Sequence, residues 1–362
     1  MRSIIRGAGL YDTFLLPDEL ALFSRQQLDK GNLPLWEKKI FSFILDFLDP
    51  SDHIIQESSG TTGMPKKLKI RKEAMIFSAR LTAKEIGLQQ GRLALLCLPV
   101  NYIAGKMMIV RALTTGMMLK WIEPSALPAI TSDEKVDFCA MVPLQVYNLL
   151  EKGYPVSHIK NLIIGGSSIS STLENLLKDM PSRIYETFGM AETCSHIALR
   201  RISGSDAKPW FTALPGVKIT TDSHSCLVIE APFLPEPVVT RDVVEIRNKT
   251  DFIWKGRVDY IINSGGVKIN PEITEKIIGD VLDHEVYLVG VPDDKLGQKI
   301  VMAALFHYSS GEKEKVIQKL KEILPAHHAP SEIIDLSSFP RNSAMKVNRI
   351  ELLQQVLEKT EK

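Results

Sequence analysis

The chain has 362 residues, of which 44% are hydrophobic and 24% are charged, and its formal net charge is +1 at pH 7. This length and apolar content predict two or three domains with ordinary hydrophobic cores. The near-neutral charge gives no overall field for nucleic acid, and polar residues interrupt the most apolar region, 93–122, so we expect neither a nucleic-acid partner nor membrane insertion.

The four cysteines lie far apart in the sequence, and the first twenty residues lack a basic start followed by an apolar stretch. We therefore expect no disulfide framework, no zinc site and no signal peptide. A reducing cytoplasm is the expected location.

Hydrophobic periodicity predicts alternating helices and strands through the first half of the chain. A helix is expected over Leu35–Leu48, ending before Asp49 and Pro50, whereas the rest of the first fifty residues stays unplaced. Strands are then expected over 67–70, 93–98, 117–122, 138–142 and 162–164, with helices over 73–86, 105–115, 144–152 and 172–178. Such alternation is typical of an α/β domain with a mostly parallel sheet.

From residue 210 to about residue 253, short alternating runs with many prolines predict a small antiparallel β unit. Further on, the pattern predicts an α+β unit with strands over 258–262, 286–291 and 301–306 and helices over 271–281 and 313–324. We therefore predict an α/β fold. Its large N-terminal domain, residues 1–258, contains the mostly parallel sheet and the small β unit, and a small mobile α+β C-terminal domain follows, residues 259–362.

Residues 58–66 combine glycines, hydroxyl side chains and a lysine: Ser58, Ser59, Gly60, Thr61, Thr62, Gly63 and Lys66. Glycine permits tight turns, and hydroxyl and backbone N–H groups can surround one anion. The spacing differs from the common G-x-x-x-x-G-K-[ST] loop, and such runs are often plain surface loops. We interpret the segment as a polyphosphate-binding loop because of the motifs that follow it.

Five further motifs follow in a fixed order: LIIGGS at 162–167, YETFGMAET at 185–193, TRD at 240–242, GRVD at 256–259 and PRNSAMKVNR at 340–349. Together with the loop they resemble the adenylate-forming superfamily of acyl-CoA synthetases, adenylation domains and luciferases, over about residues 55–357. The resemblance implies an AMP-forming acid–thiol ligase. Such an enzyme uses ATP, Mg²⁺ and coenzyme A to activate a small carboxylic acid through an acyl-adenylate.

The resemblance also implies roles for single residues. Lys346 would bridge the carboxylate and phosphate oxygens, because positive charge offsets the repulsion between two anions, and Glu192 would ligate Mg²⁺. Asp242 would accept hydrogen bonds from the ribose, Arg257 would support it, and Phe188 would stack on adenine. The other positions implied around the nucleotide are Gly165, Gly166, Ser167, Glu186, Thr187 and Gly189. The plain alternatives are a solvated lysine, a surface glutamate, a turn aspartate, a strand-end arginine and a core aromatic.

In this superfamily the C-terminal domain swings after adenylation, and Asp259 lies at the position that resembles the hinge. Gly265 and Gly266 would then border the incoming coenzyme A. Their alternative role is a plain hairpin turn.

Three details are similar to the o-succinylbenzoate–CoA ligases of menaquinone synthesis: TRD in place of T-G-D, the segment LPVNYIAG at 98–105, and an arginine–alanine pair at 111–112. That acid carries a second carboxylate, so its pocket needs a cation. Arg111 is the first candidate and Lys106 is the rival, and Tyr102 is expected on the acid side. A polar helix face is the alternative for both cations.

The chain departs from the superfamily pattern in four ways: a short region precedes the loop at residue 58, Tyr102 stands where histidine is common, Ala191 replaces threonine, and Met345 replaces glycine. Because the charged groups that the chemistry needs are retained, we expect turnover. The open alternatives are another aromatic or short acid, a carrier-protein thiol as acceptor, a nucleotide-binding homologue without turnover and, on the S-x-x-K spelling at 343–346, an acyl hydrolase. The oligomeric state stays open, a homodimer included.

Overall fold

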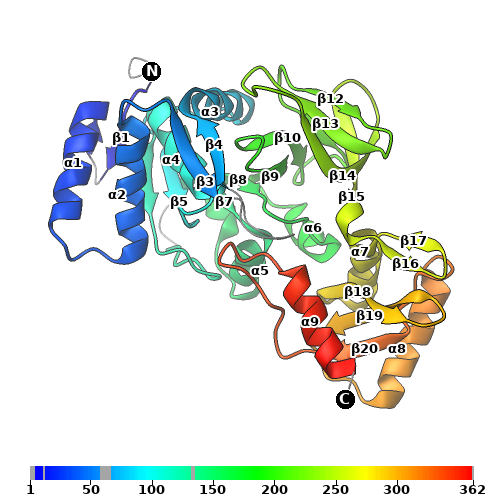
Figure 1. Ribbon diagram of the computed structural model, residues 1–362. Helices are drawn as coiled ribbons and strands as arrows, with labels where there is room; N and C mark the ends of the chain where they lie inside the picture. The colour runs from blue at the N-terminus through cyan, green and yellow to red at the C-terminus, as the bar shows by residue number, and fades with distance from the viewer. Residues whose placement is uncertain (1–4, 11–12, 58–66, 132–134, 361–362) are drawn as a thin grey trace.

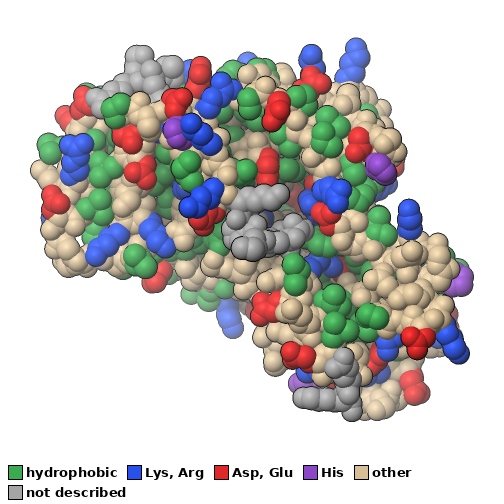
Figure 2. All heavy atoms as spheres, viewed as in Figure 1, with side chains coloured by type: hydrophobic (Ala, Val, Ile, Leu, Met, Phe, Trp, Pro, Cys, Tyr) green, Lys and Arg blue, Asp and Glu red, His purple; other side chains and the backbone are tan. Residues whose placement is uncertain are grey.

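The structure is a computed structural model that describes residues 5–10, 13–57, 67–131 and 135–360 (Figure 1). The chain forms two lobes, a larger one built on a 13-stranded sheet and a smaller one built on a 5-stranded sheet. In the space-filling view the small lobe projects from the lower right of the large one (Figure 2). The predicted α/β class is confirmed.

The centre of the large sheet is parallel, as predicted. Its strands follow the order β9, β8, β7, β5, β6 and β1, and each of these neighbouring pairs is parallel. The helices between these strands cover the faces of the sheet, and the strands are therefore apolar runs that are buried on both faces. The bounds are α3 Lys72–Ile86, β5 Leu93–Leu96, α4 Ile103–Thr115, β6 Met118–Trp121, β7 Val136–Met141, α5 Pro143–Glu151, η2 Val156–His158, β8 Ile159–Ile164, α6 Ser171–Leu177 and β9 Arg183–Gly189.

The predicted antiparallel β unit is also confirmed, and it extends the same sheet beyond β9. Its strands pair antiparallel with their neighbours, which is the usual result of period-two patterning. The strands are β10 His196–Arg201, β11 Phe211–Ala213, β12 Lys218–Thr221, β13 Cys226–Glu230, β14 Val238–Ile246 and β15 Asp251–Arg257.

The N-terminal region forms a helical pair on one flank of the large lobe, drawn in blue in Figure 1. Its second helix is the one predicted over Leu35–Leu48, and the first comes from residues that the sequence left unplaced. The second helix buries Phe41, Ile44 and Phe47 completely or nearly so, and these residues join the main core. At its C-terminal end the fully buried Lys72 ammonium contacts the Asp49 carboxylate at 2.6 Å. The elements are β1 Ala8–Leu10, β2 Thr13–Leu15, α1 Pro17–Asp29, α2 Leu35–Leu48, β3 His53–Glu57 and β4 Lys67–Arg71.

The small lobe has its own core between a sheet and three helices. The strand predicted over 258–262 is wrong, because the Ile261 amide closes a turn onto the Val258 carbonyl and a strand begins only at Ile262. The helices predicted at 271–281 and 313–324 are found. The elements are η3 Val258–Tyr260, β16 Ile262–Ser264, β17 Val267–Ile269, α7 Pro271–Leu282, β18 Val286–Asp293, β19 Gly297–Ala304, α8 Ser310–Ile323, β20 Glu332–Asp335 and α9 Arg349–Thr360.

The two lobes touch where α6 of the large lobe meets α7 of the small one. The Thr172 hydroxyl donates to Asp283 at 3.2 Å, and the Lys276 ammonium lies 3.9 Å from the Glu174 carboxylate. Among the helices of the described part of the chain, none has the length and apolar composition needed to cross a membrane.

Candidate active site

A glycine turn follows β8 at the edge where the parallel strands end. A Cβ built on Gly165 would lie 2.1 Å from Thr187 Oγ1 of the neighbouring strand β9, so this position has room only for hydrogen. Gly166 adopts φ +95°, a backbone conformation that glycine takes at low cost. The turn therefore presents bare backbone at the carboxyl edge of the sheet, where α/β folds commonly bind ligands.

Lys346 of the small lobe lies over this turn. A Cβ built on Gly166 would be 3.1 Å from Lys346 Cε and 4.0 Å from Nζ. Burial lowers the pKa of the Lys346 ammonium, and the nearby Arg257 lowers it further, whereas Glu192 acts in the opposite sense. Lys346, Gly166, Glu192 and Arg257, which are widely separated in sequence, are thus brought together.

The loop that carries Lys346 is held firmly by its own residues. The Lys346 amide donates to Asn342 Oδ1 at 3.1 Å, and its carbonyl accepts from the Asn342 amide at 2.9 Å. Met345 adopts φ +63°, the left-handed conformation that the glycine of the family pattern would take without strain. The arginines on either side of the loop each donate two hydrogen bonds to one glutamate of the small lobe. Arg341 donates to Glu285 and Arg349 donates to Glu275, so both ends of the loop are fixed to that lobe.

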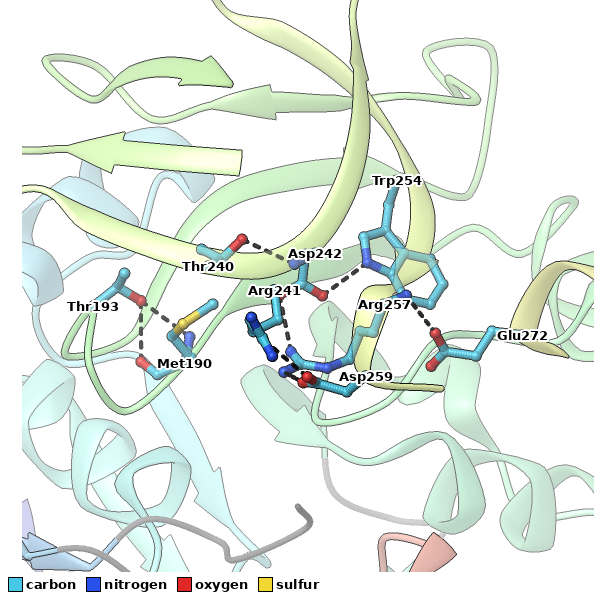
Figure 3. Close-up of polar contacts among 9 residues, drawn as sticks. All are labelled: Met190, Thr193, Thr240, Arg241, Asp242, Trp254, Arg257, Asp259 and Glu272. Atoms are coloured by element: carbon cyan, nitrogen blue, oxygen red, sulfur yellow. Dashed lines mark hydrogen bonds and ion pairs between the residues drawn. The ribbon is translucent and has the colours of Figure 1, made fainter. Parts of the chain in front are cut away.

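Figure 3 shows the polar contacts that surround Asp242 on β14. Its two carboxylate oxygens accept from Trp254 Nε1 at 2.9 Å and from Arg257 at 3.0 Å. Burial raises the pKa of Asp242, and the adjacent Arg257 opposes that shift. Carboxylate oxygens have further lone pairs, so Asp242 stays able to accept from a ligand hydroxyl.

The turn that carries Glu192 is braced by the threonine of the same motif. The Thr193 hydroxyl accepts from the Met190 amide at 3.0 Å (Figure 3). It also lies 2.7 Å from the Ser195 carbonyl oxygen. Glu192 itself is exposed. Within the described ranges, no three His, Cys, Asp or Glu side chains group as a metal site, so Mg²⁺ held at Glu192 would need phosphate oxygens or water as its other ligands.

Successive side chains of β9 point to opposite faces of the sheet, so the residues of the YETFGMAET motif do not all face the glycine turn. Thr187 faces the glycine turn, whereas Glu186 and Phe188 point to the opposite face of the sheet. The Glu186 carboxylate pairs with Arg200 at 2.7 Å and accepts from the Ile169 amide at 3.0 Å, so it braces the segment after the turn. Direct contact of Glu186 with the nucleotide stays a prediction.

Phe188 packs against two other aromatic rings. The ring centroids of Phe211 and Phe252 lie 5.6 Å and 5.2 Å from that of Phe188, and Phe188 is 9% exposed. Core packing, the plain alternative, accounts for these contacts. Stacking on adenine stays a prediction.

Arg111 lies in the interior between α4, α3 and β10. Its side chain is 2% exposed; one terminal nitrogen donates to Ser195 Oγ at 2.8 Å and lies 3.4 Å from His196 Nδ1. Its Nε has no hydrogen-bond partner, and no carboxylate of the described residues pairs with it. Burial lowers the pKa of Arg111 to about 10. A buried guanidinium without a counter-ion is costly unless a ligand supplies the negative charge.

Ser195 and His196 were not selected from the sequence, although they directly follow the second motif. Burial and the neighbouring Arg111 hold the pKa of His196 well below its usual range, so its ring is neutral at pH 7. His196 Nε2 lies 2.9 Å from Thr82 Oγ1, which is fully buried on α3. With Nε2 as the donor, Nδ1 is free to accept from Arg111.

Lys106 lies on the same helix as Arg111 but lines a cavity that Arg111 does not reach. Its ammonium is 3.4 Å from the Ile55 carbonyl oxygen and 5.7 Å from the centroid of the Phe43 ring. This cavity of about 400 Å³ also borders Asp46, Asp49 and His53. Tyr102 lines an adjacent cavity of about 470 Å³, and its hydroxyl contacts that of Ser343 in the small lobe. The structure therefore does not bring the two candidate cations together.

The remaining predicted site residues fall into three sets. Residues 58–66, the predicted phosphate loop, lie outside the described part of the chain. Ser167 follows the glycine turn and Gly189 ends β9, and both are exposed. Gly265 and Gly266 form the turn between β16 and β17 with positive φ, as a plain hairpin would have, and the structure does not test contact with coenzyme A.

The model of a protein family described as "AMP-binding enzyme" matches residues 38–220, which is half of the chain. The chain belongs to this family. The family match, together with curated relatives that are named CoA ligases, shows that the chain is an AMP-forming acid–thiol ligase. The mixed sheet with its separate small lobe is the fold of adenylate-forming enzymes.

Among curated relatives, the 2-succinylbenzoate–CoA ligase of Listeria monocytogenes is 26% identical over 324 residues, covering 82% of this chain and 69% of the relative. A solved acyl-CoA synthetase (AMP-forming)/AMP-acid ligase II-like protein from Dyadobacter fermentans is 30% identical, with a TM-score of 0.59, and covers 91% of this chain and 98% of its own. The o-succinylbenzoate CoA synthetase of Bacillus subtilis, solved with its acyl-adenylate intermediate, is 19% identical with a TM-score of 0.74 over 96% of this chain and 95% of its own. The same synthetase with ATP and magnesium has a TM-score of 0.69 at 21% identity, covering 92% of this chain and 82% of its own. The likeness to this synthetase shows the fold.

Proposed function

We propose that this AMP-binding enzyme is an o-succinylbenzoate–CoA ligase, which activates the acid with ATP, releases diphosphate, and then forms the thioester with release of AMP. The observation that carries the choice of acid is the buried guanidinium of Arg111 without a carboxylate partner in the described part of the chain. The curated relatives that are named 2-succinylbenzoate–CoA ligases and the TRD sequence at 240–242 support the same acid.

In the adenylation step the chain must hold two anions close together. The Lys346 ammonium, which lies over the Gly166 turn, offsets the repulsion between the attacking carboxylate and the α-phosphate. Asp242 accepts from the ribose, and Arg257 keeps that carboxylate oriented. Glu192 would hold Mg²⁺, which when bound neutralises charge on the phosphate oxygens.

The acid pocket requires an additional cation because this substrate carries a second carboxylate. Arg111 meets the need, since two of its contacts are to neutral groups, Ser195 and His196, and its Nε is unused. A ligand carboxylate at Arg111 would form charge-assisted hydrogen bonds in a site shielded from water. An acid without a second carboxylate would leave the guanidinium uncompensated, which favours the dicarboxylic acid.

The proposal is tested by incubating the full chain with ATP, Mg²⁺, coenzyme A and o-succinylbenzoate and detecting the thioester by mass. A panel of aromatic and short acids in ATP–diphosphate exchange gives the comparison. We expect the highest rate with o-succinylbenzoate and a much lower rate with the analogue that lacks the ring carboxylate. Equal rates with both acids would contradict the proposed substrate, and ATP binding without diphosphate release from any acid would contradict the ligase.

A further inference from the structure

Arg241 stands where the superfamily pattern has glycine, and its side chain reaches the junction of the two lobes (Figure 3). Arg241 Nε donates to Asp259 Oδ1 at 2.9 Å, and Arg257 donates to the other oxygen, Oδ2, also at 2.9 Å. Asp259 therefore lies between two guanidinium groups from the large sheet. Two charge-assisted hydrogen bonds fix its position relative to the large lobe.

The same contacts continue to the proposed ribose acceptor. Arg257 donates through its other terminal nitrogen to Asp242 at 3.0 Å. Charges alternate along the row of Arg241, Asp259, Arg257 and Asp242, so each ion lies between partners of opposite sign or at the end of the row. A direct ionic connection thus joins the nucleotide side of the site to the lobe junction.

Two further hydrogen bonds hold the junction just before a short turn. The Arg257 amide donates to Glu272 Oε2 at 2.8 Å, and Asn270 Nδ2 donates to the Lys255 carbonyl at 2.7 Å, so α7 of the small lobe binds the end of β15. A short turn, Val258–Tyr260, then leads into the small sheet. Rotation of the small lobe at this turn would separate Asp259 from Arg241 as it withdraws Lys346 from Gly166.

We propose that Arg241 is a positioning residue that holds Asp259 and thereby favours the arrangement in which Lys346 lies over the glycine turn. The inference rests on the proposed ligase function and on the division into domains 1–258 and 259–362. The Arg241 side chain is 68% exposed, so its ion pair is weak and is screened by salt. We expect a population shift of about two- to fivefold when the pair is removed.

The first test compares the two half-reactions in the full chain. Arg241→Ala should slow ATP–diphosphate exchange about two- to fivefold, whereas thioester formation from preformed acyl-adenylate keeps its rate or becomes faster. Arg241→Lys should restore part of the loss because it keeps the charge. Arg247→Ala is the matched control, since Arg247 is exposed just after the same strand and contacts Trp210. Equal losses in both half-reactions, or none, would overturn the proposal.

The second test does not depend on which acid is the substrate. Thr172→Cys with Asp283→Cys places two thiols across the α6–α7 contact, where the native side chains are 3.2 Å apart, and the four native cysteines are buried. Cross-linking by a short bifunctional thiol reagent should be about two- to fivefold slower with Arg241→Ala at low salt, and the difference should vanish at high salt. An unchanged cross-linking rate overturns the proposal. A changed rate without turnover of o-succinylbenzoate instead leaves Arg241 assigned and refutes the proposed acid.

Discussion

The surroundings of Lys346 make its charged form costly as long as no anion is bound. Its ammonium is partly buried beside a bare glycine turn, and its pKa responds to one cation, Arg257, and one anion, Glu192. Burial and Arg257 both lower the pKa of this amine. A bound polyphosphate would act in the opposite sense, because a nearby negative charge favours the charged form. The group is thus poised to gain more from an anionic ligand than an exposed lysine would.

Replacing this lysine should separate adenylation from the later step. We expect Lys346→Ala to lower the rate of ATP–diphosphate exchange by roughly 10²–10³, the usual cost of removing one preorganised donor. Lys295→Ala, an exposed lysine of the same lobe, serves as the control and should keep the wild-type rate. An unchanged exchange rate in Lys346→Ala would refute the assignment of the catalytic lysine.

Arg111 gives a second prediction, because its removal should weaken binding of the acid without lowering the stability of the fold. Arg111→Met should raise the KM for o-succinylbenzoate by about 10–100-fold, the worth of a hydrogen bond to a charged group, and leave the KM for ATP nearly unchanged. The melting temperature should stay level or rise, because the variant no longer buries an uncompensated charge.

Lys106→Ala is the matched control for Arg111, since Lys106 belongs to the same helix but faces the cavity beside Phe43. Its KM for the acid should not change. A large effect of Lys106→Ala together with none for Arg111→Met would reverse the assignment. Unfolding of Arg111→Met at unchanged KM would show that the arginine is structural.

The sequence identified both cations and ranked Arg111 ahead of Lys106, but it did not show which of the two faces the site. Residues five apart on a helix point about 140° away from each other, so only one of the two can face a given pocket. Which face turns inward depends on the packing of α4 against α3 and β10, which bring Thr82 and His196 to Arg111. These partners are remote in sequence from the helix, so no local pattern reveals them.

At the scale of elements, strong periodicity was the reliable guide. α2, α3, α7 and α8 were predicted within a few residues because each has an apolar face with helical spacing. The strand expected at 258–262 failed because its apolar residues serve two different structures, a turn tied by Asp259 and the start of β16. Pairing with a remote strand, as for β20 beside β19, leaves no local signal.

The first turn of α7 contains a carboxyl group that is a weaker acid than usual, and this leads to a pH prediction. Burial raises the pKa of Glu272 from 4.5 to about 7, and Arg349 opposes the shift. Between these two pH values the folded chain keeps a proton that the unfolded chain has lost, so this group stabilises the fold at low pH. That stability is lost as the pH rises through about 7, by roughly 2–3 kcal/mol.

Glu272→Gln should remove this dependence, because glutamine still accepts from the Arg257 amide but cannot ionise. We expect the melting temperatures of variant and wild type to coincide near pH 5, and the variant to melt several degrees higher near pH 8. Thermal unfolding across pH 5–8 measures the difference. Parallel curves over the whole range would contradict the raised pKa.

At the scale of the whole molecule, the site is divided between the two lobes. The large lobe supplies Gly165, Gly166 and Asp242, and the small lobe supplies Lys346 through a loop that its own arginines support. The order of the motifs was readable from the sequence, since each is a contiguous string. The distance between Lys346 and Gly166 was not, because it depends on the angle between lobes joined by one short turn.

That dependence makes Asp259 the position where rotation can be tested, and the structure changes how the test must be designed. Asp259→Pro fixes φ, but it also removes the carboxylate that binds Arg241 and Arg257. Asp259→Ala removes the same carboxylate while leaving the backbone free to turn. The difference between these two variants therefore reports the rotation alone.

We expect Asp259→Ala to slow adenylation a few-fold, on the scale of an exposed ion pair, and to retain thioester formation. Asp259→Pro should retain a comparable adenylation rate but lose thioester formation by at least tenfold beyond Asp259→Ala, because the small lobe is held in one orientation. Single-turnover rates of each half-reaction measure both steps. If the two variants lose thioester formation equally, the carboxylate rather than the backbone is what matters at residue 259, and a swinging small lobe would have to be abandoned.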